Sequence, residues 1–368
     1  MLRTGAGRLA TSEALPTSVR AVLGYYGDAG VFDWGSLRLK RHVDDVTEAM
    51  IDVAFAEIED RLAEEFGRED VSFAYDTKLV LPAQLTLGYQ YRHLDEADHE
   101  RVEALTRLAI EALVDGDMRD AINDDEFGDF EVDFPADPED RRRVAELAQS
   151  TLQARVDAGF ADFPGGVRDA YEWAVDVSEA HQAADERFRE LMAAARGEVE
   201  GGADETEGAT LDPAQARERI REEYKHAAFA DPPELFSADE LDLPYFKTQY
   251  DRVGVIYDGM LGMYASAGFP VEDAFRKSIV LAIIGAQLWL DDVDDYAADM
   301  REGQLTPVTA EYLLADSDRV AYEATVDISG QYLDLAIERA TAADSPLTGI
   351  ATKYIYYSGS PEVLPDSG

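Results

Sequence analysis

Apolar residues recur at spacings of three and four positions along most of this chain, which is the period of an amphipathic α-helix. Residues 37–66 show the period clearly, with Val43, Val46 and Met50 on one face. The same pattern continues in eight further segments, which are 98–114, 138–160, 166–196, 212–229, 244–267, 271–301, 308–314 and 318–342. The hydrophobic pattern therefore predicts an all-α protein.

Local signals refine this prediction at three places. Asp212 followed by Pro213 favours a helix start, with the Asp as the cap and the Pro in the first helical position. Gly303 is a plausible helix stop. Minor strands are expected only near 71–91, where Pro82 weakens a strand assignment.

The domain organisation predicted from these segments is an N-terminal helical region, 1–140, followed by a main helical bundle, 141–368. The bundle is interrupted at 198–213 by a Gly-rich acidic stretch without an apolar anchor, which is typical of a loop. Two interpretations of this loop stay open: a lid that closes over a bound ligand, or a linker.

The charge of the chain limits its partners. It has 77 Asp plus Glu against 33 Lys plus Arg, a formal net charge of −44 in 368 residues. Such a chain repels itself unless concentrated salt screens the charges, so we expect a salt-adapted, halophilic protein. Nucleic acids and anionic membranes are disfavoured as partners, since both bind basic surfaces.

Two absences point to a cytoplasmic protein. There is no cysteine, which excludes disulfides and thiolate chemistry and is compatible with a reducing compartment. The longest apolar run, 278–290, is much shorter than the ~20 residues that span a bilayer. We therefore expect no transmembrane segment and a cytoplasmic location.

Five carboxylates follow that apolar run within nine positions, in the stretch 285–307, GAQLWLDDVDDYAADMREGQLTP. At 100° per residue, four of them share one face of a helix, namely Asp291, Asp292, Asp295 and Asp299. Such neighbours repel one another unless a cation or salt intervenes, and Mg²⁺ prefers carboxylate, water and phosphate oxygens. The pattern indicates a metal-binding face, although a solvated helix end on an acidic protein is the simpler alternative.

This stretch resembles the second aspartate-rich motif of class I isoprenoid synthases, the all-α prenyltransferases and terpene synthases. The family pattern Q-x-x-D-D-x-x-D is matched by Gln287 and Asp291–Asp295, and the tail by Asp299, Gly303 and Thr306-Pro307. Here Leu288 to Leu290 separate Gln287 from the aspartate pair, a one-residue variation. The resemblance covers roughly 245–357, about a third of the chain.

The resemblance implies an antiparallel helical bundle of the isoprenoid synthase type. It implies a Mg²⁺-dependent enzyme that acts on an allylic prenyl diphosphate, by prenyl transfer or cyclisation with release of diphosphate. Asp291, Asp292 and Asp295 would be the catalytic, metal-facing residues, with Asp299 as a further metal ligand. Dimers are common in the family, so a homodimer is the expected assembly.

The family also needs a first aspartate-rich motif on a facing helix. No DDxxD occurs at the usual distance upstream, and the best substitute is Asp176 with Glu179, which we predict as the first metal site. Two earlier acidic runs, 44–48 and 95–100, are alternatives. One residue in five of this chain is a carboxylate, so such patterns also arise from composition alone.

A diphosphate needs basic partners, and the chain has few lysines. Arg217, Arg221 and Lys225 form a stripe at intervals of four, and Lys247 lies where the resembled family places a phosphate-contacting Lys. We predict these four as diphosphate-binding residues. Ion pairs between the stripe and neighbouring glutamates are the alternative interpretation.

Other chemistry finds little support in the sequence. The five histidines lack the paired spacing of a zinc site, and no GxSxG or Walker loop is present. Two further functions remain open: a non-catalytic relative that binds a prenyl diphosphate or a protein partner, and an unrelated acidic helical interaction protein. Two carboxylate clusters facing each other across one cavity would favour the enzyme.

Overall fold

The computed structural model describes residue 10 and residues 15–30, 34–198 and 211–366. Most of the predicted acidic loop, 199–210, lies outside the described residues. The chain forms two compact units. Unit 1 comprises Met1–Phe32, Trp173–Asp258 and Glu272–Gly368, and unit 2 comprises Asp33–Glu172 and Gly259–Val271. The division is thus discontinuous in sequence, and the boundary predicted near residue 140 falls inside unit 2.

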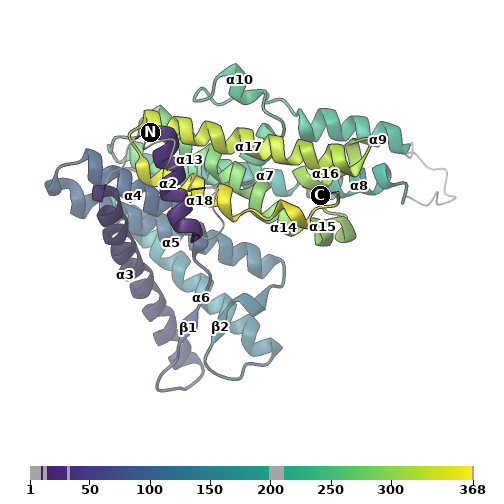
Figure 1. The fold of residues 1–368 in the computed structure, drawn as a ribbon. Helices are drawn as coiled ribbons and strands as arrows, with labels where there is room; N and C mark the ends of the chain where they lie inside the picture. The colour runs from purple at the N-terminus through teal and green to yellow at the C-terminus, as the bar shows by residue number, and fades with distance from the viewer. Residues whose placement is uncertain (1–9, 11–14, 31–33, 199–210, 367–368) are drawn as a thin grey trace. The chain divides into compact units, whose positions relative to one another are not determined.

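The described residues are mostly helical, which confirms the predicted all-α class (Figure 1). Unit 2 contains α3 (Trp34–Glu65), α4 (Leu81–His93), α5 (His99–Asn123), α6 (Pro138–Gly159) and four short 3₁₀ turns, η1 (Lys78–Val80), η2 (Glu96–Asp98), η3 (Phe127–Asp129) and η4 (Phe160–Asp162). Two helices are shared between the units: α7 (Gly165–Gln182) and α12 (Val255–Ser266).

Unit 1 holds the remaining elements. Its helices are α2 (Thr17–Ala29), α8 (Asp185–Arg196), α9 (Pro213–Ile220), α10 (Ala238–Leu241), α11 (Phe246–Gln249), α13 (Asp273–Ala286), α14 (Asp292–Asp294), α15 (Tyr296–Glu302), α16 (Pro307–Leu314), α17 (Asp318–Ala342) and α18 (Pro346–Ser358), followed by the 3₁₀ turn η8 (Pro361–Val363). The predicted start at Asp212-Pro213 is confirmed, since the Asp212 carboxylate accepts a hydrogen bond from the Gln215 N–H. Gly303 ends α15 with a φ of 76°, as predicted.

Strands are a minor part of unit 2, and one of them lies in the segment 71–91, where minor strands were expected. Only Phe73–Ala74 of the segment 71–91 is a strand, β1, and it pairs antiparallel with β2, Glu131–Val132. Most of the rest of the segment belongs to the helix α4. Pro82 stands in the first turn of α4, where no helical partner is needed for the missing N–H. The proline that weakened the strand prediction was therefore marking a helix start.

The centre of unit 1 is α13, which packs along α17, while α18 packs against α2 (Figure 1). The helices α13 and α17 approach closely at Gly285, the small residue just before the acidic motif. A Cβ atom added there would lie 2.7 Å from Leu333 Cδ2 and 3.2 Å from Tyr332 Cβ. Glycine is thus required at this position for the two helices to approach so closely.

Replacing Gly285 with alanine should destabilise unit 1 by about 1–3 kcal/mol, because the core is already filled at that point. Thermal and urea unfolding would measure the loss. Gly330→Ala on α17 is the matched control, since its added Cβ meets nothing within 4 Å and should stabilise the helix by up to ~1 kcal/mol. Equal stability of the two variants would contradict the packing argument.

Three π-helical turns interrupt the helices of unit 1 and are the only π turns among the described residues. They are η5 (Arg221–Lys225), η6 (Tyr250–Gly254) and η7 (Gln287–Asp291). Each is closed by a bond over five residues, as from the Asp292 N–H to the Gln287 carbonyl. Such turns are rare and frequently mark functional sites.

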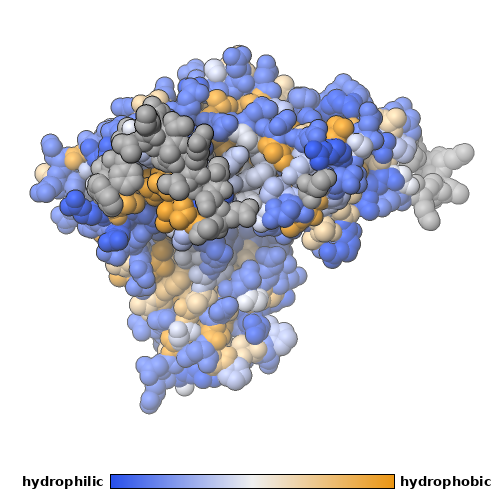
Figure 2. All heavy atoms as spheres, viewed as in Figure 1, coloured by the Kyte–Doolittle hydropathy of each residue, from blue (hydrophilic) through white to orange (hydrophobic). Residues whose placement is uncertain are grey.

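The face shown in Figure 2 is mostly hydrophilic, with hydrophobic residues among the hydrophilic ones. Within the described ranges, no helix combines the length and the apolar character needed to cross a membrane.

Candidate functional site

The acidic motif contains one deeply buried carboxylate, that of Asp292, which is 2% exposed. Its Oδ1 accepts a hydrogen bond from Gln287 Nε2 at 3.2 Å and lies 3.6 Å from Arg252 Nη1. Its Oδ2 is buried and has no hydrogen-bond partner. A buried polar atom without a partner destabilises the folded state, so binding a proton, a hydrogen-bond donor or a cation at this oxygen would be favourable.

The other aspartates of the motif act on Asp292 through their charge. Burial is the main cause that raises the pKa of Asp292 to about 7; the nearby charges of Asp299 and Asp291 contribute in the same direction, and Arg252 and Gln287 oppose them. Burial likewise raises the pKa of Asp299 to about 6, with Asp295 adding to the shift. Negative charge is therefore unfavourable in this corner of unit 1, and a cation would relieve it.

The four predicted metal ligands do not share one continuous helical face. The π turn η7 and a break at Asp295 divide the stretch into α14 and α15. Asp292 is buried and Asp299 half-buried, whereas Asp291 and Asp295 are exposed. The predicted angles assumed 100° per residue throughout, which the π turn does not obey.

Arg252, in the π turn η6, is the cation that faces this corner. Burial lowers the pKa of its guanidinium, but the surrounding groups outweigh that effect and raise it; they are Asp292, Tyr224, Asp185 and Asp299. Asp185 begins α8, so a carboxylate from a different helix acts on Arg252 as well. Acidic groups from α8 and from α14 and α15 thus meet around one arginine.

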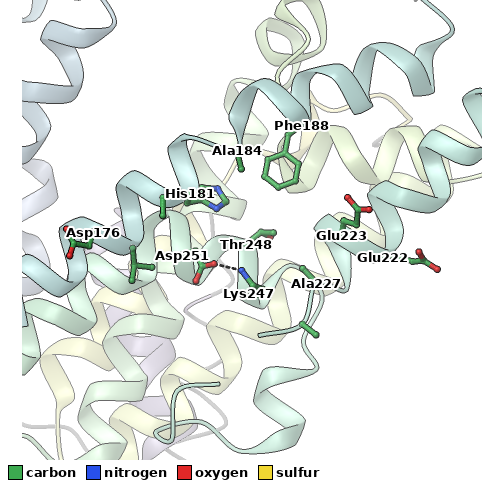
Figure 3. Close-up of a pocket in the computed structure, with 13 residues that line it drawn as sticks. Asp176, His181, Ala184, Phe188, Glu222, Glu223, Ala227, Lys247, Thr248 and Asp251 are labelled. Carbon is green, nitrogen blue, oxygen red and sulfur yellow. Dashed lines mark hydrogen bonds and ion pairs between the residues drawn. The ribbon is translucent and has the colours of Figure 1, made fainter. Parts of the chain in front are cut away.

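A pocket of about 620 Å³ opens beside this cluster in unit 1 (Figure 3). Half of its lining is apolar and comes mainly from α7 and the residues after η5, namely Val177, Ala180, Ala184, Phe188, Ala227 and Ala228. Its polar lining is Asp176, His181, Glu222, Glu223, Lys247, Thr248 and Asp251. Lys247 Nζ lies 2.5 Å from Asp251 Oδ2, the pair joined by the dashed line in Figure 3. His181 lines the pocket, and its pKa is lowered by burial and then by the charges of Arg252 and Lys247.

The predicted first metal site is brought to the pocket only in part. Asp176 lines the pocket, one helical turn before Ala180 on the same face of α7. Glu179 is exposed and does not line it. The alternative runs at 44–48 and 95–100 belong to unit 2. Of the carboxylates that precede the acidic motif in the sequence, Asp185 is the one whose charge acts on Arg252, and it lies nine residues after Asp176.

The predicted basic stripe is broken by the π turn η5. Arg217 is exposed, and Arg221 forms an ion pair with Glu218. Lys225 turns inward, where its Nζ lies 2.6 Å from Glu311 Oε1. Only Lys247 of the four predicted diphosphate ligands lines the pocket.

The donor set suits a hard cation, although a complete site is not assembled. Within the described part of the chain, no group of three or more His, Asp or Glu side chains could hold a metal ion. Mg²⁺ commonly takes one or two protein carboxylates and completes its shell with water and phosphate oxygens. The orphaned Oδ2 of Asp292, with Asp299 nearby, fits that requirement.

Sequence reasoning missed Tyr224 and the role of Asp185. Tyr224 is buried, donates to the Leu305 carbonyl at 2.9 Å and lies near Arg252. Its aromatic ring among charged residues, in the sequence REEYKH, was the available signal. Asp185 could have been found only by knowing that α8 restarts there after a break.

His181 should make the stability of unit 1 depend on pH. Burial, and after it the charges of Arg252 and Lys247, lower its pKa to about 4, whereas an unfolded His titrates near 6.5. Between these values the unfolded state binds the proton and the folded state does not. The contribution of His181 to stability is therefore complete above pH 6.5 and is lost as the pH drops towards 4, by up to about 3 kcal/mol.

Urea unfolding of the native protein and of His181→Gln at pH 7, 6 and 5 would test this, and the free energy of unfolding of the native protein should fall relative to that of the variant as the pH drops. His226→Gln is the control, since the exposed His226 imidazole has a pKa that burial lowers less. Parallel curves for the native protein and His181→Gln would contradict the assignment.

The chain was compared with known proteins. No protein-family model, no curated protein and no solved structure matches it.

Proposed function

We propose that this chain is a Mg²⁺-dependent enzyme of the class I isoprenoid type, acting on an allylic prenyl diphosphate by prenyl transfer or cyclisation. The observation that carries the proposal is the convergence of the three π turns. They supply Tyr224, Arg252 and the start of the Asp292 segment to one acidic corner. Three rare turns at one place, around a buried carboxylate with an orphaned oxygen, are typical of a site kept for function.

The acidic corner would hold the metal and the phosphate end of the substrate. Asp292 and Asp299 would ligate Mg²⁺, with Asp291 and Asp295 exposed beside them. The metal, when bound, supplies neutralisation of the charge that develops on the departing diphosphate. Lys247 lines the pocket, and the charge of Arg252 acts on His181, which also lines it; both cations would contact phosphate oxygens.

The pocket would hold the isoprenoid chain. Its volume of about 620 Å³ is in the range of small-molecule sites, and Val177, Ala180 and Phe188 provide apolar walls. Such walls exclude water from a reactive carbon skeleton. His181, neutral above its low pKa of about 4, adds no charge to this wall at ordinary pH.

A non-catalytic prenyl diphosphate binder is the second candidate. It is favoured by the placement of Asp176 and Glu179, which do not complete a second carboxylate pair opposite Asp292. The reading of the motif as a solvated helix end is disfavoured by Asp292 itself, since a solvent-facing aspartate would not be 2% exposed.

Diphosphate release tests the proposal. Purified protein in molar KCl with Mg²⁺ would be incubated with ten-, fifteen- and twenty-carbon allylic diphosphates, with and without isopentenyl diphosphate. Release that requires Mg²⁺ supports the enzyme, and dependence on isopentenyl diphosphate separates elongation from cyclisation. A melting temperature raised by Mg²⁺ and substrate without any release supports the binder. If neither diphosphate release nor a raised melting temperature is observed, both the enzyme and the binder are rejected.

A further inference from the structure

In the Arg252–Asp292 pair, the carboxylate is the most buried one of the acidic motif, and the arginine side chain is able to move away from it. Asp292 is 2% exposed and sits between a π turn and α14, so its carboxylate has little freedom. The Arg252 side chain is 32% exposed, and its Nη1 lies 3.6 Å from Oδ1 of Asp292. Of the two partners, Arg252 is therefore the one able to move towards solvent.

The charges around the pair show what Arg252 does. Asp292 and Asp299 are both acidic groups held in a buried environment, and Arg252 is the cation that offsets both of them. A divalent cation at Asp292 would meet the guanidinium at close range, and two like charges repel strongly at such distances in a poorly hydrated corner. Arg252 and a metal ion thus compete for the same carboxylate.

We propose that Arg252 is an internal counter-ion, which in the protein alone offsets the charge of Asp292 from the Oδ1 side and competes with a divalent cation that binds at Oδ2. Metal binding at Oδ2 would drive Arg252 away from Asp292, because two like charges would otherwise share one buried carboxylate. A withdrawn guanidinium presents its planar fork to the pocket side, where a phosphate can accept two hydrogen bonds from it. Metal loading and phosphate binding would be coupled through the position of this one side chain, a coupling that rests on the proposed function.

Metal binding without any substrate tests the competition. Free Mn²⁺ would be measured by electron paramagnetic resonance during titration of the folded, full-length protein, followed by displacement with Mg²⁺. Arg252→Gln should bind Mn²⁺ at least about tenfold more tightly than the native protein, because a competing charge is gone. Arg319→Gln is the control for overall charge, since Arg319 pairs with Glu323 on the surface of α17, and it should leave the affinity almost unchanged.

Two more variants keep the test decisive. Adding Asp292→Asn to Arg252→Gln should abolish the gain, and a gain that persists would overturn the proposal. If Arg252→Gln does not fold, Arg252→Lys retains a cation but reaches Asp292 less well, so Mn²⁺ affinity should rise about threefold. Unchanged or weaker Mn²⁺ binding in the folded variant would also overturn it. Tighter Mn²⁺ binding without diphosphate release would reject only the enzymatic function.

Discussion

Asp292→Asn should abolish Mg²⁺-dependent diphosphate release, with a loss of at least ~100-fold, while the protein stays folded. The loss is expected because the buried Oδ2 is the ligand oxygen that no other group satisfies. The fold should survive because asparagine has nearly the same shape and removes one charge from a mutually repelling group. Steady-state release of diphosphate and the melting temperature would be measured together.

Asp294→Asn is the matched control for this loss. Asp294 lies two residues away in the same short helix, α14, and is exposed. Its replacement should change activity by less than about twofold, because a screened surface charge contributes little. If the two variants lose activity equally, net charge rather than a metal ligand is responsible. If Asp292→Asn unfolds the protein, the carboxylate is structural.

Lys225→Met should destabilise the protein by about 3–5 kcal/mol and should not act through substrate binding. Glu311 is 5% exposed, and its Oε1 receives both Lys225 Nζ at 2.6 Å and the Tyr245 hydroxyl at 2.5 Å. Removing the lysine leaves this carboxylate buried with only the tyrosine. Urea unfolding in molar KCl would measure the loss.

Two comparisons isolate the buried pair. Arg221→Met removes an exposed partner of Glu218 three residues away and should cost less than about 1 kcal/mol. The double variant Lys225→Met with Glu311→Gln should recover part of the loss, since no unpaired charge remains. A mild Lys225→Met phenotype with a raised KM would restore Lys225 as a phosphate ligand.

The regular parts of the fold were predictable because their signals are local. Helical periodicity located α3, α6 and α17 within a few residues, and it found the start of α5 but ended that helix at 114 instead of Asn123. A helix cap was equally readable, since Asp212 and Pro213 begin α9 as predicted. The role of Gly285, by contrast, appears only with Leu333 beside it in the folded unit.

The site was predictable only in outline. The acidic motif, Asp176 and Lys247 were found from the sequence, but the partners that decide their roles lie far along the chain. Lys225 is the clearest example, because its stripe was drawn on an ideal helix and the π turn η5 redirects it towards Glu311. Propensity and periodicity carry no signal for such a turn, since the long-range contacts of the folded unit stabilise it.

The π turn η7 has a consequence for comparing this chain with others. A π turn closes its hydrogen bond over five residues, whereas an α-helical turn closes it over four. The turn η7 therefore contains one extra residue and behaves as a single-residue insertion, while the helical residues before and after it keep their register. It begins at Gln287 and ends at Asp291, the interval that is one residue longer than in the motif it resembles. An alignment should therefore open a one-residue gap between Gln287 and Asp291. Without that gap, either Gln287 or the aspartates fall out of register.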